Sequence, residues 1–245
     1  TARRAVLPGT EGRFSVRPRE LAATPTERRT ALMRRLLERH GVLLREALAY
    51  EGVAGGFSAL YDVLSALEDR GMCRRGYFVE GRGTTQFALP GADDRLRAAR
   101  ESDGDALHWV SAVDPAFAYG AALPFPETRP TAHPTRSAGA HAALVDGVLA
   151  AWVSRGGDGL VTFPGAHGGD GRLAADLAAR ALARVLAALS GRGKRAFSLR
   201  TIDGLDATSH PERATFEQHG FQRRGDALVL AHEGRGRADM PEVRP

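Results

Sequence analysis

The stretch between Thr24 and Leu89 constrains the fold most, because it combines three helical patterns with a glycine-tipped hairpin. It begins with Thr24-Pro25-Thr26-Glu27, where threonine can cap a helix, proline fits the first helical position and glutamate completes a capping box. Leucines then recur at helical spacing as far as Gly41, a natural helix stop. The pattern therefore predicts a helix that is capped by Thr24 and ends before Gly41.

Two further helices and a hairpin complete this stretch. The sequence predicts a short helix over residues 44–50 and, after a glycine turn, a third helix over 58–70 with one apolar face. Residues 72–79 and 84–89 are predicted as two strands around a glycine-rich turn. Helices closed by such a hairpin form a winged helix. We therefore predict a winged helix over residues 24–101, including a last helix near 93–101.

The second half of the chain mixes strand and helix patterns. We predict an α+β protein in which the winged helix is followed by a mixed α/β, barrel-like module over residues 102–233. Residues 1–23 are predicted to be a linker or the end of a preceding module, and residues 234–245 a disordered tail. The elements predicted in the second module are a strand at 107–113, a loop at 124–137, a three-stranded meander within 140–163, a helix at 173–189, a strand at 197–202, a helix at 210–219 and a strand at 227–231.

Charge and composition favour some partners and exclude others. The net charge of +5 and the pI of about 10.1 favour polyanions, although an arginine-, alanine- and glycine-rich composition can also reflect codon usage. The single cysteine, Cys73, excludes an internal disulfide framework and a cysteine zinc cluster, and the histidines lack metal-ligand spacing. The Gly191–Arg195 segment lacks the spacing of a phosphate loop. We therefore expect no metal and no cofactor in this chain.

The ends and the hydropathy of the chain give further expectations. No apolar run reaches the ~18–20 residues that cross a bilayer, so no membrane partner is expected. No signal peptide follows Thr1, and the missing initiator methionine suggests a fragment or a trimmed chain. The expected location is the cytoplasm.

Arginines on the predicted hairpin and first helix are the candidate DNA contacts. The third helix is net acidic, with Asp62, Glu68 and Asp69 against Arg70, and phosphates would repel it. Two interpretations stay open at this point, namely direct DNA contact and a protein–protein spacer. Tyr77 is a candidate stacking aromatic, with hairpin core as the alternative. The candidate DNA-binding residues are Arg28, Arg35, Arg74, Arg75, Arg82 and Tyr77.

Asp114 is the candidate catalytic carboxylate. It follows the predicted strand 107–113 and precedes an aromatic-rich loop, a position where a carboxylate can act as a general base or stabilise positive charge. The alternative is an aspartate that starts a turn before Pro115. Asp146-Gly147 and Asp203-Gly204 are predicted to be hairpin turns.

A combination of motifs resembles the C-terminal region of large helicase-related (Lhr) proteins and extends over roughly residues 12–230. The motifs are Gly52–Tyr61, Arg74–Gly81, Gln86–Gly91, Asp114-Pro115, Tyr119–Pro126, Ala138-Gly139, Leu144–Gly147 and Arg155–Gly157. Such proteins are ATP-dependent DNA helicases with a long C-terminal extension that is similar to AlkZ-type DNA glycosylases and built from winged helices and a β-barrel module. In some relatives this extension is linked to uracil–DNA glycosylase activity and to oligomerisation.

The resemblance implies a role within a larger machine. The motor, with its Walker A and DEAH-type sequences, is absent from this chain, so ATP and Mg²⁺ would belong to the motor of the parent protein. Glycosylase chemistry would need a flipped base and a carboxylate near the sugar, with Asp114 as the candidate and Gln86 as a weaker polar assistant. The sequence departs from the family pattern at Phe125 and Val113, where relatives often carry Trp and Thr.

Three functions follow as hypotheses. The favoured one is a DNA-binding and assembly module of an Lhr-type helicase involved in DNA repair, with no chemistry of its own. The alternatives are a DNA (uracil) glycosylase module and a structural oligomerisation module, so whether the chain is an enzyme stays open. The expected partners are single-stranded or damaged DNA at the bacterial nucleoid, the helicase core of the same polypeptide and a possible second copy of the chain.

Overall fold

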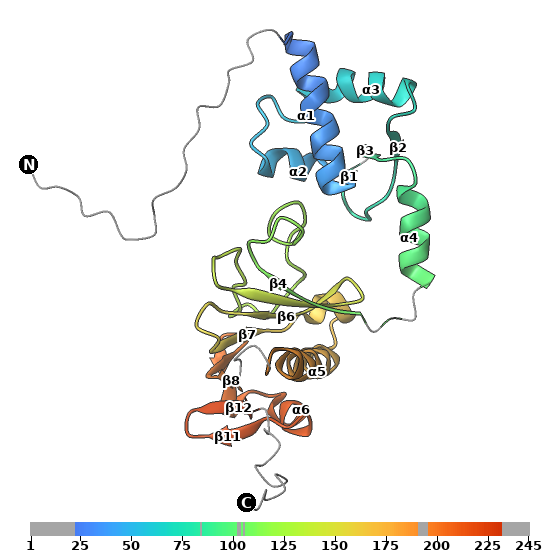
Figure 1. Cartoon of the computed structure of the whole chain (residues 1–245). Coiled ribbons are helices and arrows are strands. Elements are labelled where there is room, and N and C mark those ends of the chain that lie inside the picture. Colours follow the sequence, from blue (N-terminus) through green and yellow to red (C-terminus); the bar gives the residue numbers. More distant parts are fainter. Residues whose placement is uncertain (1–22, 84, 102–103, 105, 191–195, 232–245) are drawn as a thin grey trace, which may run out of the picture.

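The chain folds into two lobes that contact each other along one side. The computed structural model describes residues 23–83, 85–101, 104, 106–190 and 196–231. Residues 24–101 form the winged-helix lobe and residues 106–231 form the C-terminal lobe, which lies below it in Figure 1. The predicted tail, all but one residue of the predicted linker, and the Gly191–Arg195 segment lie outside the described residues.

The first lobe has the element order of a winged helix, as predicted. Its strands form an antiparallel sheet in the order β1-β3-β2, against which the helices pack. Thr24 Oγ1 accepts a hydrogen bond from the Glu27 N–H (3.2 Å), and the Glu27 carboxylate accepts one from the Thr24 N–H (2.7 Å), which confirms the capping box. The elements are α1 (Pro25–His40), β1 (Val42–Leu43), α2 (Arg45–Tyr50), η1 (Ser58–Leu60), α3 (Tyr61–Asp69), β2 (Arg74–Gly76) and β3 (Gln86–Ala88).

The hairpin differs from the prediction in length. The strands β2 and β3 have three residues each instead of the predicted runs 72–79 and 84–89, and the loop between them is correspondingly longer. The ladder ends at Gly76 because the Gln86 side chain, rather than a partner strand, binds the next backbone groups. Strand β1 was not predicted, since two residues carry no periodicity that a pattern can detect.

A helix without buried residues follows the wing. Helix α4 (Ala92–Glu101) confirms the predicted helix near 93–101, but none of its side chains is buried. It extends from the winged-helix lobe toward the first strand of the C-terminal lobe (Figure 1). Its side chains therefore contribute nothing to the buried core of the lobe.

The C-terminal lobe is built on an open six-stranded sheet in the order β10-β9-β7-β6-β5-β4. All neighbouring strands are antiparallel except β7 and β9, which are parallel and are joined through the long helix α5. A second sheet has the order β11-β12-β8. The elements are β4 (Leu107–Ser111), β5 (His141–Val145), β6 (Val148–Val153), β7 (Gly159–Val161), η2 (Pro164–His167), α5 (Gly171–Leu189), β8 (Ala196–Leu199), β9 (Thr201–Ile202), β10 (Leu205–Asp206), η4 (Ala207–Ser209), α6 (Arg213–Gln218), β11 (Gln222–Arg224) and β12 (Ala227–Ala231).

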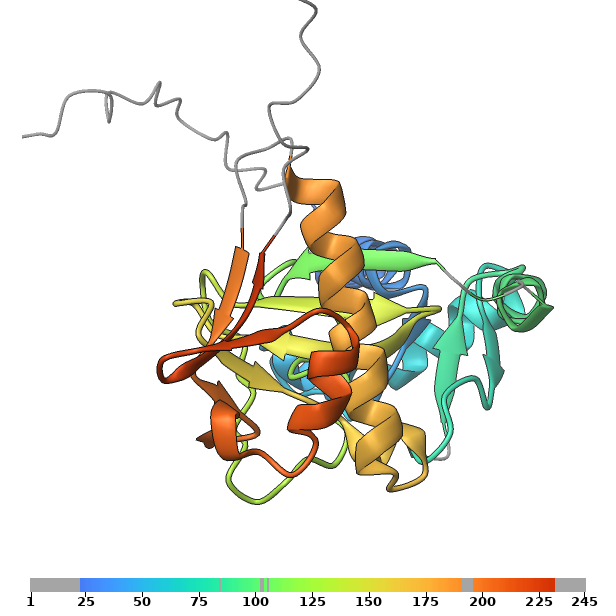
Figure 2. The ribbon, with the colours of Figure 1, turned by 90° about the horizontal axis from the view of Figure 1, so that it is seen from below.

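Helix α5 and the second sheet cover one face of the large sheet. Figure 2 shows α5 running across this face, with α6 and the small sheet beside it. The alanine-rich face of α5 is buried against the sheet together with Phe197, Phe216 and Leu228. Small side chains let the helix approach the strands closely. The layer between α5 and the sheet is the main core of the lobe.

The α+β class is confirmed, but the barrel-like module is not. Within the described residues the large sheet does not close on itself, because β10 and β4 are its two edges. The predicted strand 197–202 divides at Arg200 into β8 and β9, which belong to different sheets. The short strands β10 and β11 were not predicted. The predicted loop at 124–137 and the meander within 140–163 are confirmed.

The other face of the large sheet is covered by the segment between β4 and β5. Phe117 and Phe163 are buried there, and Trp152 donates through Nε1 to the Thr135 carbonyl (3.0 Å). Asp203 and Gly204 form the predicted hairpin turn, with φ of +53° and +76°. Thr131 Oγ1 donates to the Asp203 carbonyl (2.6 Å), so this turn fixes the covering segment to the sheet. That segment is the one that faces the winged-helix lobe.

Candidate nucleic-acid interface

The wing loop is shaped by one buried amide, Gln86. Its Oε1 accepts from the N–H groups of Phe78 (2.9 Å) and Val79 (2.8 Å). Its Nε2 donates to the carbonyls of Val79 (2.8 Å) and Arg82 (2.6 Å). Two accepted and two donated bonds use the full hydrogen-bonding capacity of a glutamine amide. We therefore assign Gln86 a structural role in the wing.

Two cations and one aromatic ring stand on the outside of this loop. Arg74 lies exposed on β2, and Arg82 is half-buried at the tip. Tyr77 is 81% exposed, so it is not part of the hairpin core that the sequence left as an alternative. Within the described part of the chain, no carboxylate lies within ion-pair distance of Arg74 or Arg82. Their charges are therefore available to a ligand.

Arg75 is different, because its guanidinium is held against the lobe. It forms an ion pair with Glu68 (2.7 Å), donates to the Tyr61 hydroxyl (2.7 Å), and lies 5.3 Å from the ring centroids of Tyr61 and Phe87. Glu68 compensates its charge, and cation–π contacts fix its direction. The structure therefore places this predicted DNA contact inside an internal network, which sequence reasoning missed because the pair joins α3 to β2.

Helix α1 presents a second cationic surface. Arg28 is exposed, and Arg35 is exposed with Glu38 at 3.6 Å, a weak surface pair. Arg29 and Arg34 are also exposed on this helix. Helix α3 carries acidic residues and contributes no comparable cation. Among α1, α2 and α3, the net positive charge thus lies on α1.

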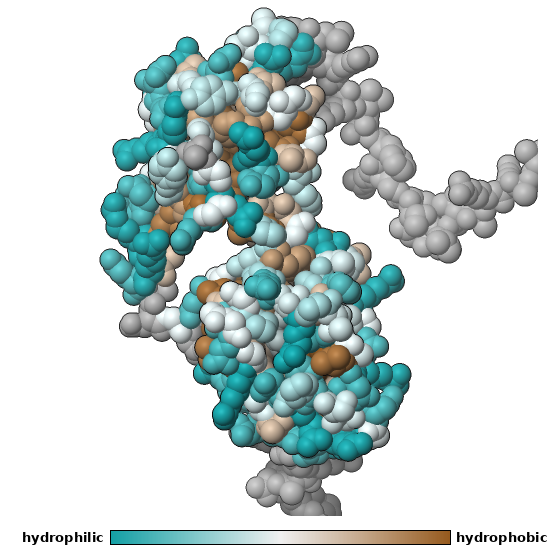
Figure 3. All heavy atoms as spheres, turned by 180° about the vertical axis from the view of Figure 1, so that it is seen from behind, coloured by the Kyte–Doolittle hydropathy of each residue, from teal (hydrophilic) through white to brown (hydrophobic). Residues whose placement is uncertain are grey.

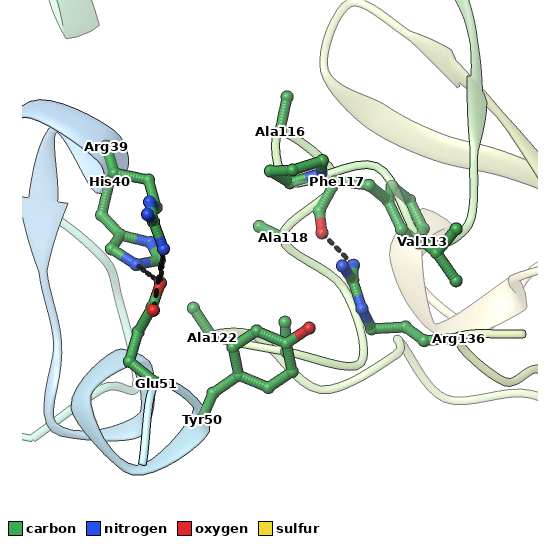
Figure 4. Close-up of a pocket in the computed structure, with 12 residues that line it drawn as sticks. Arg39, His40, Tyr50, Glu51, Val113, Ala116, Phe117, Ala118, Ala122 and Arg136 are labelled. Atoms are coloured by element: carbon green, nitrogen blue, oxygen red, sulfur yellow. Dashed lines mark hydrogen bonds and ion pairs between the residues drawn. The ribbon is translucent and has the colours of Figure 1, made fainter. Parts of the chain in front are cut away.

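A cleft of about 230 Å³ lies between the two lobes. Figure 4 shows its two walls, one from the ends of α1 and α2 and the other from the loop after β4. Glu51 accepts from Arg39 (2.8 Å) and lies 2.9 Å from His40 Nε2, which ties α1 to the end of α2. Burial, the largest influence, raises the pKa of Glu51, but Arg39 and His40 together outweigh it and lower the pKa below its ordinary value.

Arg136 forms the opposite wall of this cleft. Its guanidinium donates to the carbonyls of Phe117, Tyr119 (3.4 Å) and Asp114 (3.2 Å). It lies 5.4 Å from the ring centroid of Tyr50 and 5.8 Å from that of Phe117. Arg136 therefore joins the two lobes by stacking between an aromatic ring of each. No local sequence pattern could have indicated the contact between Arg136 and Tyr50, because the two residues are far apart in the sequence.

Asp114 lies at the edge of the cleft but starts a turn. Its Oδ1 accepts from the Ala116 N–H (2.8 Å), and its carbonyl accepts from Phe117 N–H (3.0 Å) and from Arg136. This is the turn that the sequence offered as the alternative. The neighbours Val113 and Pro115 line the cleft, whereas the predicted DNA contacts Arg28, Arg35, Arg74, Arg82 and Tyr77 do not. The structure thus separates the catalytic candidate from the cationic surfaces.

The described residues contain neither a cluster of metal ligands nor a helix that could span a membrane. No group of three or more His, Cys, Asp or Glu side chains suited to a metal occurs among the residues that the structure describes. None of the described helices combines the length and apolarity that a membrane span requires. Apolar residues reach the surface mainly on the winged-helix lobe and at its junction with the C-terminal lobe, whose rear face is largely polar (Figure 3).

Fold and surface together define a winged-helix protein with an attached mixed α/β unit. A family model described as "Large helicase-related protein, winged-helix domain" matches residues 22–108. The Mycolicibacterium smegmatis (strain ATCC 700084 / mc(2)155) protein "Lhr helicase/ probable uracil glycosylase" is 46% identical over 167 residues, which cover 65% of this chain and 11% of that protein. The Escherichia coli (strain K12) protein "Lhr helicase/uracil glycosylase" is 36% identical over 160 residues, covering 64% and 10%.

These similarities confirm the resemblance to large helicase-related proteins that the sequence motifs indicate. The chain is a relative of the large helicase-related (Lhr) proteins and carries a winged-helix domain of that family. It spans about a tenth of the length of these two relatives.

Proposed function

We propose that this chain is a DNA-binding module of an Lhr-type helicase and that it contacts the phosphate backbone through its wing and α1. The observation that carries the proposal is the wing itself, where Arg74 is exposed on β2 and Tyr77 and Arg82 lie on the adjoining loop that Gln86 holds in shape. Cations that release counterions and an aromatic ring that can stack on a base are the two elements of sequence-tolerant DNA binding.

The acidic α3 defines how the lobe approaches DNA. A helix bearing Asp62, Glu68 and Asp69 would be repelled in a major groove, so we do not propose base reading by α3. Contact through backbone and wing predicts weak sequence preference. It also predicts a strong decrease in affinity as salt increases.

The experiment compares a variant of the wing with a variant at an exposed arginine of the C-terminal lobe. Fluorescence anisotropy of a labelled oligonucleotide should show that the Arg74→Ala/Tyr77→Ala/Arg82→Ala variant of the full chain binds at least tenfold more weakly. Arg172→Ala removes an exposed arginine on the C-terminal lobe and should change affinity less than twofold. Equal losses in both variants, or no loss in either, would contradict a role of the wing.

The larger context of the module is proposed from the relatives. The names of the two relatives include "helicase", so we propose that the module serves the helicase core of its parent polypeptide in DNA repair at the nucleoid, where ATP and Mg²⁺ would act at the motor. Self-association of the module is a further possibility for the parent assembly. Light scattering with and without DNA distinguishes a chain that is monomeric without DNA from one that is already an oligomer.

A second candidate function is glycosylase activity at Asp114. Both relatives carry "uracil glycosylase" in their names, and Asp114 starts the loop that lines the interlobe cleft. A carboxylate there could stabilise positive charge at the sugar or activate water. The test is uracil release from single strands by Asp114→Asn, because asparagine can still accept the turn hydrogen bond from Ala116.

A matched variant keeps that test specific. Asp146 also lies in a turn, and its carboxylate accepts a hydrogen bond from the Ala106 N–H of a neighbouring segment (2.9 Å), so Asp146→Asn makes the same change away from the cleft. Activity should be lost only in Asp114→Asn, with both variants folded. Full release by Asp114→Asn would exclude this carboxylate, and no release by the unaltered chain would exclude catalysis by this module alone.

A further inference from the structure

The interlobe cleft has one wall from each lobe, so a ligand within it would contact both. The winged-helix side contributes Arg39, Tyr50 and Glu51, and the C-terminal side contributes Arg136 and a run of small side chains. Ala116, Ala118, Ala121 and Ala122 line the cleft and leave its volume of about 230 Å³ open. A cavity of this size suits a single small unit of a ligand rather than a whole duplex.

The charge of the cleft favours an anion. Within the described part of the chain, Arg136 has no carboxylate within ion-pair distance, and its guanidinium donates hydrogen bonds to three main-chain carbonyls. Carbonyl oxygens carry only partial negative charge, so the guanidinium is oriented without being neutralised. On the other wall Glu51 is shared between Arg39 and His40. The cleft therefore presents a positioned cation suited to a phosphate group.

The aromatic ring of Tyr50 supplies the second kind of contact. Tyr50 is the last residue of α2 and is 53% exposed, although Arg136 lies against its ring at 5.4 Å. Figure 4 shows the ring facing the open space between the two walls. A ring fixed by a cation–π contact and still half-exposed is a ready stacking surface for a flat heterocycle.

We propose that this cleft binds one unpaired nucleotide of single-stranded DNA, with its phosphate at Arg136 and its base stacked on Tyr50. A base inside a duplex is stacked on both sides and cannot reach Tyr50, so the cleft selects single strands, whereas the wing accepts either form. This inference rests on the proposed DNA-binding function. It adds a second contact, between the two lobes, that determines the form of DNA preferred.

Photocrosslinking tests the inference directly. Halogenated uracil crosslinks to aromatic side chains that stack on it, so we would irradiate the full chain with a strand of about 12 nucleotides containing one 5-iodouracil. Mass spectrometry should place the crosslink on Tyr50. Tyr50→Ala should remove this crosslink and lower single-strand affinity about tenfold relative to duplex affinity. Tyr50→Phe keeps the ring and should retain both.

The controls separate this inference from the proposed function. Leu173→Ala removes an exposed apolar side chain on α5 and should leave crosslink and affinity unchanged. A strand that binds but crosslinks only to Tyr77 would overturn the cleft inference and leave the wing proposal intact. Equal losses in Tyr50→Phe and Tyr50→Ala would overturn stacking. A chain that binds no DNA would overturn the proposed function itself.

Discussion

At the scale of single residues, the wing depends on an amide that is almost fully buried. Replacing Gln86 by leucine would keep the volume but leave the backbone groups of Phe78, Val79 and Arg82 without their partners. We expect Gln86→Leu to lower the free energy of unfolding by about 2–4 kcal/mol. Urea denaturation followed by circular dichroism measures this.

An exposed glutamine provides the control for this change. Gln218→Leu makes the same substitution at an exposed position of α6 and should shift stability by less than about 0.5 kcal/mol. Equal stability of the Gln86→Leu and unaltered chains would show that the wing loop does not need this amide.

At the scale of elements, the junction of α1 and α2 depends on the ionised form of Glu51. Its pKa is lowered in the folded chain, so its contribution is fully present above the ordinary value of 4.5 and is lost as the pH falls through the folded value. Glu51→Gln should therefore cost about 1 kcal/mol at pH 7 and progressively less below pH 4.5.

Thermal or urea unfolding at several pH values follows this difference. Glu80→Gln alters an exposed glutamate of the wing and should stay within about 0.5 kcal/mol of the unaltered chain at pH 7. A cost of Glu51→Gln that grows in acid would contradict the sign of the argument, because protonation should make the two chains more alike.

Two hairpin turns of the C-terminal lobe provide a matched pair of glycines. Gly147 and Gly204 have φ of +78° and +76°, but a Cβ at Gly147 would meet nothing within 4 Å, whereas one at Gly204 would lie 2.1 Å from the Thr131 carbonyl oxygen. Gly147→Ala should cost about 1 kcal/mol from backbone strain, and Gly204→Ala about 2–4 kcal/mol. Equal losses on urea denaturation would mean that the covering segment is not held closely at Gly204.

Local patterns explain which elements could be predicted from the sequence. The capping box at Thr24 and the long alanine–leucine pattern of α5 act within a few residues, so they predicted their helices correctly. The division of residues 197–202 between two sheets is set by the neighbouring strands, which a sequence pattern does not contain. The two-residue strands β1 and β10 are too short to show alternation.

At the scale of the whole molecule, the candidate site was less predictable than the fold. Arg74, Arg82 and Tyr77 were recognised because they flank a glycine-rich turn that ends up exposed. The compensation of Arg75 by Glu68 and the contact of Tyr50 with Arg136 depend on how separate elements pack. Side-chain identity therefore indicated the surface of the wing, and only the tertiary arrangement revealed the cleft between the lobes.

The dependence of DNA affinity on salt tests the central claim most directly, because each phosphate contact contributes about 0.9 to the slope of log K against log salt. The full chain and its Arg74→Ala/Arg82→Ala variant should be titrated with one duplex at several salt concentrations. We predict that the slope of the variant is smaller by about 1–2, whereas that of Arg172→Ala is unchanged. Identical slopes for the wing variant and the unaltered chain would contradict phosphate binding by the wing.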